Sequence, residues 1–140
     1  MLTESWLRRG AVTVLAALLA CGVPSALWAQ ALFERFNLAV ASDRADEVTA
    51  LLARGMDPNT VDPNGDPALL VAARSGFEPT LDALLRAGAK INARNRVGDS
   101  AVMAAAIGGY LAIVIKLVVR GSETNAPGWT LLTYSAHAAR

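Results

Sequence analysis

The triplet Gly98-Asp99-Ser100 and the histidine His137 are the residues of this chain that suggest catalytic chemistry. A serine acts as a nucleophile when a histidine takes its proton and a carboxylate orients that histidine. His137 is the only histidine, and Tyr134, not an acid, precedes it by three positions. The similar triplet Gly65-Asp66-Pro67 ends in a proline, which cannot be a nucleophile. We therefore expect no catalytic residue, and we expect Ser100 to cap a helix.

Metal and cofactor chemistry is not expected either. One cysteine and one histidine are too few for an ordinary zinc site. The pair Gly108-Gly109 lacks the preceding strand and the glycine spacing of a phosphate-binding loop, so we read it as a turn between helices. The formal net charge is +1, with 13 basic and 12 acidic residues. Such a balance lacks the basic excess typical of nucleic-acid-binding proteins, and no such partner is expected.

Residues 1–31 have the features of a secretory signal peptide. Arg8 and Arg9 precede an apolar run over residues 11–20, which is shorter than the roughly 20 residues that span a bilayer. The small residues Ala29 and Ala31 follow at cleavage spacing, so we expect cleavage after one of them and a periplasmic or secreted protein without a transmembrane span. The alternative is a lipid anchor, because residues 18–21 are similar to a bacterial lipobox ending in Cys21.

The rest of the chain repeats with a period of 33 residues, which is the spacing from Gly55 to Gly88. Five sets of identical residues keep this spacing in one register: Gly55, Gly88 and Gly121; Asn59, Asn92 and Asn125; Leu51, Leu84 and Leu117; Ala39, Ala72 and Ala105; Gly65 and Gly98. Each period holds two short helical patterns, for example residues 67–76 followed by 81–88, each ending at a glycine. Helices this short are stable only when neighbouring repeats stack on one another.

The matching segments DPNGDPALLVAA…LLRAGAKINA and NRVGDSAVMAAA…LVVRGSETNA resemble the ankyrin repeat. The resemblance implies an all-α repeat solenoid of stacked helix pairs with β-hairpin-like finger loops. The repeats would cover about residues 32–61, 62–94 and 95–126, with a partial repeat over 127–140 whose finger is three residues shorter. Residues 32–140 would then form one domain after the signal peptide.

The resemblance also implies a non-catalytic module that binds a protein partner through its finger tips and the concave face of its first helices. The residues that we expect to contact this partner are Asp66, Arg74, Arg94, Arg96, Asp99, Ile107 and Trp129. The arginines favour an acidic partner, with solvated loop charge as the alternative. We expect the double substitution Arg74→Glu, Arg96→Glu to abolish binding with little change in thermal stability.

The second helix of the third repeat carries apolar residues on its outward side. Ile115, Leu117 and Val119 would form an exposed patch if no further helix covers them. This pattern supports an alternative function, in which the chain is a shortened fragment of a longer array. Such a fragment would self-associate through Ile115 and Val119 at its uncapped C-terminal end.

Overall fold

The computed structural model describes residues 24–122, 125–126 and 129–130. The chain divides into two compact units, residues 1–34 and residues 35–140. The described part of the first unit, residues 24–34, is helical from Ser25 on and mostly exposed, and Gln30 donates a hydrogen bond to Glu34 within it. Trp129 contributes only its backbone to the description, and His137 lies outside the described residues. No helix in the described ranges has both the length and the apolar character to cross a membrane.

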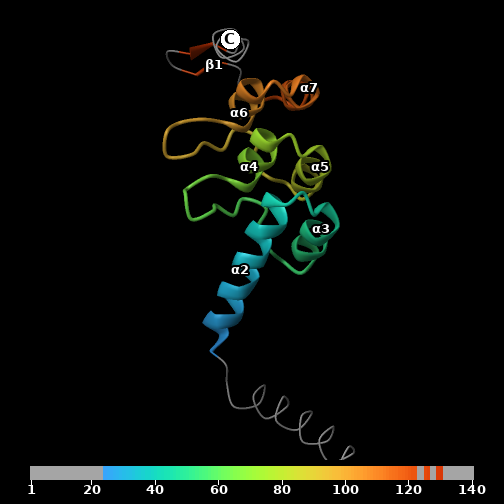
Figure 1. Ribbon diagram of the computed structural model, residues 1–140, viewed down its shortest axis with the longest axis vertical. Coiled ribbons are helices and arrows are strands. Elements are labelled where there is room, and N and C mark those ends of the chain that lie inside the picture. The colour runs from blue at the N-terminus through green and yellow to red at the C-terminus, as the bar shows by residue number, and fades with distance from the viewer. Residues whose placement is uncertain (1–23, 123–124, 127–128, 131–140) are drawn as a thin grey trace, which may run out of the picture. The chain divides into compact units, whose positions relative to one another are not determined.

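Six helices form within the described residues: α2 (Ser25–Ala41), α3 (Ala45–Ala53), α4 (Ala68–Ser75), α5 (Glu78–Arg86), α6 (Ala101–Gly108) and α7 (Leu111–Val119). Helix α6 begins one sequence period after α4, and α3, α5 and α7 begin at the same interval. Figure 1 shows α3, α5 and α7 in one row, with α4 and α6 in a second row beside them. The helices pack as α4 with α6, α3 with α5, α4 with α5 and α6 with α7. The predicted all-α repeat solenoid is confirmed.

The core lies between the two rows, and at two places in the repeat it keeps one residue type throughout. Leu51, Leu84 and Leu117 are buried at the same place in successive second helices, and Ala39, Ala72 and Ala105 are buried in the first helices. Alanine at this place lets neighbouring first helices approach closely, while leucine fills the space between the second helices. Both sets of residues belong to the period that the sequence shows.

Glycines end the second helices in the left-handed conformation that the sequence predicts. Gly55, Gly88 and Gly121 have φ angles of +97°, +89° and +92°. The first helices end in the same way at Gly76 and Gly109, each with φ +76°. The first repeat uses Asp43 at that place, with φ +53°, and its carboxylate accepts a 2.7 Å hydrogen bond from the buried Thr80 hydroxyl. This bond ties the first repeat to the second.

The predicted exposed patch on α7 is only partly correct. Ile115 and Val119 are exposed, but Leu117 is completely buried because it follows Ile113 by one helical turn and shares its inward face. Leu111 and Val118 join the exposed side instead. The charged residue of this helix, Lys116, lies half-buried and pairs with Asp82 of α5 at 2.9 Å.

Two short strands follow α7, β1 (Asn125–Ala126) and β2 (Trp129–Thr130), and they pair antiparallel. Ala126 faces Trp129, three positions on, whereas in the earlier loops Val61 faces Pro67 and Arg94 faces Ser100. The last loop therefore closes three positions sooner, as predicted from the sequence, in which Gly128 follows Gly98 by 30 positions whereas Gly98 follows Gly65 by 33.

Candidate interaction surface

Two loops project to one side of the helices (Figure 1), and each is closed by an isolated backbone bridge. We call residues 61–67 finger 2 and residues 94–100 finger 3. In finger 2 the carboxylate of Asp62 accepts hydrogen bonds from the backbone N–H groups of Asn64 and Asp66, both at 2.9 Å. In finger 3 the side-chain oxygen of Asn95 does the same for Val97 and Asp99, at 3.1 and 2.9 Å. These local bonds hold the loop backbone in a turn.

The two fingers are joined at the carboxylate of Asp66. Arg74 at the end of α4 pairs with one oxygen of this carboxylate, and the amide of Asn95 donates to the other at 2.9 Å. The Arg96 side chain lies across Gly65. A Cβ atom added to Gly65 would be only 2.6 Å from Arg96 Nε. Helix α4, finger 2 and finger 3 therefore form one connected structure.

Asp66 is held in its charged form although it is only 7% exposed. Burial alone would raise the pKa of its carboxyl group, because a charge is poorly solvated in the interior. The hydrogen bonds from Arg74 and Asn95, together with the Arg74 charge, outweigh that effect and lower the pKa below its ordinary value of 3.8. Asp66 therefore contributes to stability as an anion.

This lowered pKa predicts a pH-dependent stability. The unfolded chain binds a proton at Asp66 more readily than the folded chain, so stability is fully present above about pH 5 and is lost as the pH falls through the folded pKa. We expect Asp66→Asn to lower the free energy of unfolding by about 1–3 kcal/mol at pH 7 and by less as the pH falls below the ordinary pKa of 3.8. Urea unfolding of both proteins at several pH values measures this difference.

The variant Arg74→Gln tests whether Arg74 is the cause of the lowered Asp66 pKa. It removes the guanidinium group, whose hydrogen bond and charge both lower the pKa of Asp66, so it should remove part of the same pH-dependent stability. A stability difference between the parent chain and Asp66→Asn that is equal at pH 7 and pH 3 would contradict this assignment.

Four exposed side chains lie on or beside the joined fingers, and we call them the finger surface: Arg74, Arg96, Val97 and Ile107. Val97 at the tip of finger 3 is 85% exposed, and Ile107 at the end of α6 is 47% exposed. Ile107 follows Arg74 by one period, so the two occupy the same place on neighbouring first helices. The finger surface thus combines two guanidinium groups with two apolar side chains on a rigid base.

The family model named Ankyrin repeat matches residues 64–96, from the tip of finger 2 to the tip of finger 3. The chain is an ankyrin-repeat protein. The matched segment includes Arg74, Asn95 and Arg96, and the helices on either side of it follow the same period. No curated protein sequence matches the chain. Ankyrin repeats are in general protein–protein interaction modules, and the family is generally non-catalytic.

The structure places the expected contact residues of this ankyrin-repeat protein in different surroundings. Arg96 and Ile107 are exposed, whereas Asp66 is buried under Arg74 and Asn95. Arg94 and Asp99 are half-buried, and Arg94 donates to the Gly98 carbonyl at 2.9 Å, across its own finger. The Trp129 side chain lies outside the described residues, so its role as a contact stays a prediction.

Two sequence expectations change once these contacts are known. Ser100 does precede α6, but its side chain makes no capping hydrogen bond, and its buried hydroxyl has no partner in the described part of the chain. Replacing Arg74 by glutamate would place two carboxylates side by side, with Asp66 buried. The double substitution with Arg96 would therefore reduce stability, and it cannot separate binding from folding.

Sequence reasoning missed Asn95, which is the residue that links the fingers. The repeat period indicates only its role in the turn: Asp62 stands one period earlier, and each side chain accepts hydrogen bonds from the two equivalent backbone N–H groups of its own finger. Asn59 has a similar role, since its side-chain oxygen accepts a 2.7 Å hydrogen bond from the backbone N–H of Lys90 in the next repeat. Asparagine side chains thus connect neighbouring repeats at both places.

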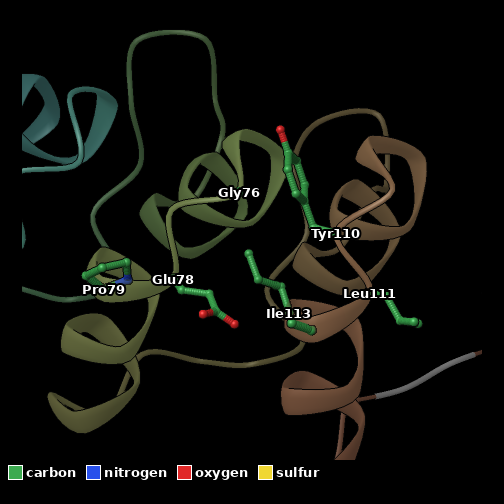
Figure 2. A pocket seen from close by; sticks show the side chains of 7 residues that line it. Gly76, Glu78, Pro79, Tyr110, Leu111 and Ile113 are labelled. Atoms are coloured by element: carbon green, nitrogen blue, oxygen red, sulfur yellow. The ribbon is translucent and has the colours of Figure 1, made fainter.

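A second feature lies where the turn between α4 and α5 meets the start of α7. A cleft of about 390 Å³ is lined by Gly76, Glu78, Pro79, Tyr110, Leu111, Ala112 and Ile113. Figure 2 shows the Glu78 carboxylate and the Tyr110 ring on either side of the Ile113 side chain. Glu78 is loosely paired, with its Oε1 atom 3.8 Å from Lys116 Nζ. The described residues hold no group of three or more metal-ligating side chains.

Proposed function

We propose that this protein is an exported, non-catalytic binding module that recognises a protein partner through the finger surface. The observation that carries the proposal is the joining of fingers 2 and 3 at Asp66, which holds Arg74 in place. Arg96 and Val97 are exposed on finger 3, and the exposed Ile107 stands one period after Arg74. A pre-organised surface loses little entropy on binding. Arginine and apolar side chains on such a surface are the residue types that dominate interface energies.

The chemistry of the finger surface favours an acidic and partly apolar partner. Guanidinium groups form paired hydrogen bonds with carboxylates, and the apolar side chains of Val97 and Ile107 favour a partner residue that excludes water. Asp66 is buried and is paired with Arg74 and Asn95. The pairing neutralises the charge of Arg74, so Arg96 supplies the exposed positive charge that would face a partner.

The experiment is affinity capture with the tagged chain from the periplasmic and secreted fractions of the organism that carries the gene. The double variant Arg96→Glu, Ile107→Asp should weaken capture of a specific protein at least tenfold, because about 2 kcal/mol is typical for a central interface residue. Arg86→Glu with Ile115→Asp makes the same changes at exposed positions of α5 and α7, and it should leave capture intact.

Two readouts make the test decisive. Circular dichroism of each variant shows whether the fold is kept, and the intact mass of the recovered chain shows whether residues 1–31 are removed or Cys21 carries a lipid. If the double variant folds and captures the same protein as the parent chain, the finger surface is not the binding site.

Self-association is a second candidate role, and the exposed side chains of Ile115 and Val119 favour it. They are 54% and 79% exposed on a helix whose opposite face is buried in the core. Exposed apolar residues that are aligned on one helix face usually mark a contact with another molecule.

A further inference from the structure

Finger 2 carries a pair of residues at its tip that can react with each other, Asn64 followed by Gly65. The side-chain amide of an asparagine can be attacked by the backbone nitrogen of the next residue. Glycine at that next position leaves the approach open, because it has no Cβ atom. Asn64 is the one asparagine of the sequence that precedes a glycine. The tip of finger 2 is therefore the place in the chain where deamidation meets the least steric hindrance.

The reaction needs only these two residues and water. The Gly65 nitrogen loses its proton and bonds to Cγ of Asn64, the bond from Cγ to Nδ2 breaks, and Nδ2 takes up a proton and leaves as ammonia. Water then opens the cyclic imide at one of its two carbonyl carbons. Opening at Cγ gives aspartate, and opening at the backbone carbonyl carbon gives isoaspartate. No atom is oxidised or reduced, and the net change is the replacement of an amide by a carboxylic acid.

Hydrogen bonds to Asp62 engage both reacting groups in the folded finger. The Gly65 N–H donates to the Asp62 carbonyl at 3.0 Å, and the Asn64 side-chain amide donates to the Asp62 carboxylate at 3.3 Å. The same carboxylate accepts the backbone N–H of Asn64 at 2.9 Å. The proton of the Gly65 nitrogen must be removed before this nitrogen can attack, and its hydrogen bond opposes that removal. The turn therefore slows the reaction as long as it stays closed.

Finger 3 adds a cover over the attacking group. The stem of Arg96 lies so close to Gly65 that a Cβ atom added there would be 2.9 Å from both Cγ and Cδ of the arginine. The hydrogen bond from Asn95 to Asp66, at 2.9 Å, holds finger 3 beside finger 2. Gly65 is consequently buried although it belongs to a projecting loop, while Asn64 next to it is exposed. Hydroxide and water have poor access to the Gly65 nitrogen in this arrangement.

We propose that Asn64 is a deamidation site that the joined fingers protect, and that it reacts when finger 2 opens away from Arg96. Projecting loops open locally far more often than the whole molecule unfolds. The product cannot restore the finger. Aspartate places a second carboxylate beside Asp62, and isoaspartate lengthens the backbone by one carbon atom between the N–H groups that Asp62 binds. The modification would therefore be a one-way record of finger opening, and it does not depend on the proposed function.

The test follows the mass of one peptide while the protein, produced from the full-length gene, is incubated at mildly alkaline pH. Trypsin cleaves after Arg54 and Arg74, so peptide 55–74 carries Asn64 together with Asn59, which precedes a threonine and serves as an internal reference. Fragmentation of the peptide shows which asparagine has become an acid. Asn64 in the folded protein should react at least about tenfold more slowly than in the same protein unfolded in guanidinium chloride. Asn64→Ser should leave the mass of the peptide constant.

Variants of Arg96 test the cover. Arg96→Ala should speed the reaction several-fold in the folded protein, with the circular dichroism spectrum unchanged. Arg96→Met keeps an unbranched chain over Gly65 and should react at nearly the parent rate. Arg86→Ala removes an exposed arginine of α5, outside the fingers, and is the matched control that should also keep the parent rate. If Arg96→Ala fails to fold, Asn95→Ala removes the link to Asp66 and should speed the reaction in the same way.

Three outcomes would overturn the proposal. Equal rates in the folded and the unfolded protein would mean that the fingers give no protection. A mass change at Asn59 without one at Asn64 would mean that the site is wrong. A folded Arg96→Ala variant that reacts no faster than the parent protein would mean that Arg96 does not shield Gly65, and that the joining of the fingers has no part in the reaction.

Discussion

Replacing Ile113 by alanine should lower the free energy of unfolding by about 2–5 kcal/mol, the usual range for a large apolar side chain removed from a core. Ile113 is 1% exposed on the inner face of α7, and it belongs to the same core as Leu84 and Leu117. A nine-residue helix is marginal by itself, so its stability depends on this packing. Urea unfolding followed by circular dichroism at low micromolar concentration measures the loss.

The matched control is Ile115→Ala, which makes the same change on the same helix. Ile115 is 54% exposed, so its truncation leaves no cavity and should change stability by less than about 0.5 kcal/mol in the monomer. Equal losses in the two variants would mean that α7 does not pack through the face of Ile113 and Leu117. The comparison also shows that the effect comes from burial and not from the helix propensity of isoleucine, which is the same at both positions.

Replacing Gly76 by alanine should lower the free energy of unfolding by about 2–4 kcal/mol, because it combines backbone strain with a steric clash. Gly76 ends α4 with φ +76°, a conformation that side chains resist. A Cβ at this position would lie 2.4 Å from Cε1 of the Tyr110 ring. The other edge of that ring lies against Gly108, where a Cβ would be 2.6 Å from Cε2, so the ring has little room to move.

The next repeat supplies the control for the strain. Gly109 ends α6 with the same φ angle, but a Cβ added there would meet no atom within 4 Å. Gly109→Ala should therefore show the backbone strain alone, about 1–2 kcal/mol. The difference between the two variants, measured by urea unfolding, is the contribution of the contact with Tyr110.

A double-mutant cycle checks this assignment. Tyr110→Ala should remove the clash, so adding Gly76→Ala to it should cost about as much as Gly109→Ala does in the parent chain. If Gly76→Ala is no more harmful than Gly109→Ala when Tyr110 is present, the ring is not confined between the two glycines. The cycle would then assign the whole loss to the backbone.

The regular part of the fold could be predicted from the sequence because its causes are local or periodic. Leucine, alanine and glycine recur once in every period, and each type has one physical role at its place, namely filling the core, allowing close approach or ending a helix. The shortened loop before Trp129 could be predicted for the same reason, because one glycine departs from the period. A division of the chain at residue 31 stays a prediction.

The interaction surface could be predicted only in part, because exposure depends on contacts between distant residues. Arg74 and Arg96 look equivalent in the sequence, yet Arg74 neutralises the buried Asp66 while Arg96 lies exposed across Gly65. The hydrogen bond from Asn95 to Asp66 joins two successive fingers, and no local sequence pattern predicts it. The cleft at Tyr110 was likewise missed, because Gly76 and Glu78 line it from a neighbouring repeat.

The sequence alone determined that this chain is a stack of helix pairs, that its helices end at glycines, and that it belongs with the ankyrin repeats. Those properties follow from a period that each repeat satisfies through its own residues and its neighbours. Tertiary structure alone decided which charged residues are neutralised inside the molecule and which apolar residues of α7 remain exposed. Those outcomes depend on where distant side chains meet in space, because charges and apolar surfaces are buried or exposed only by the contacts they make.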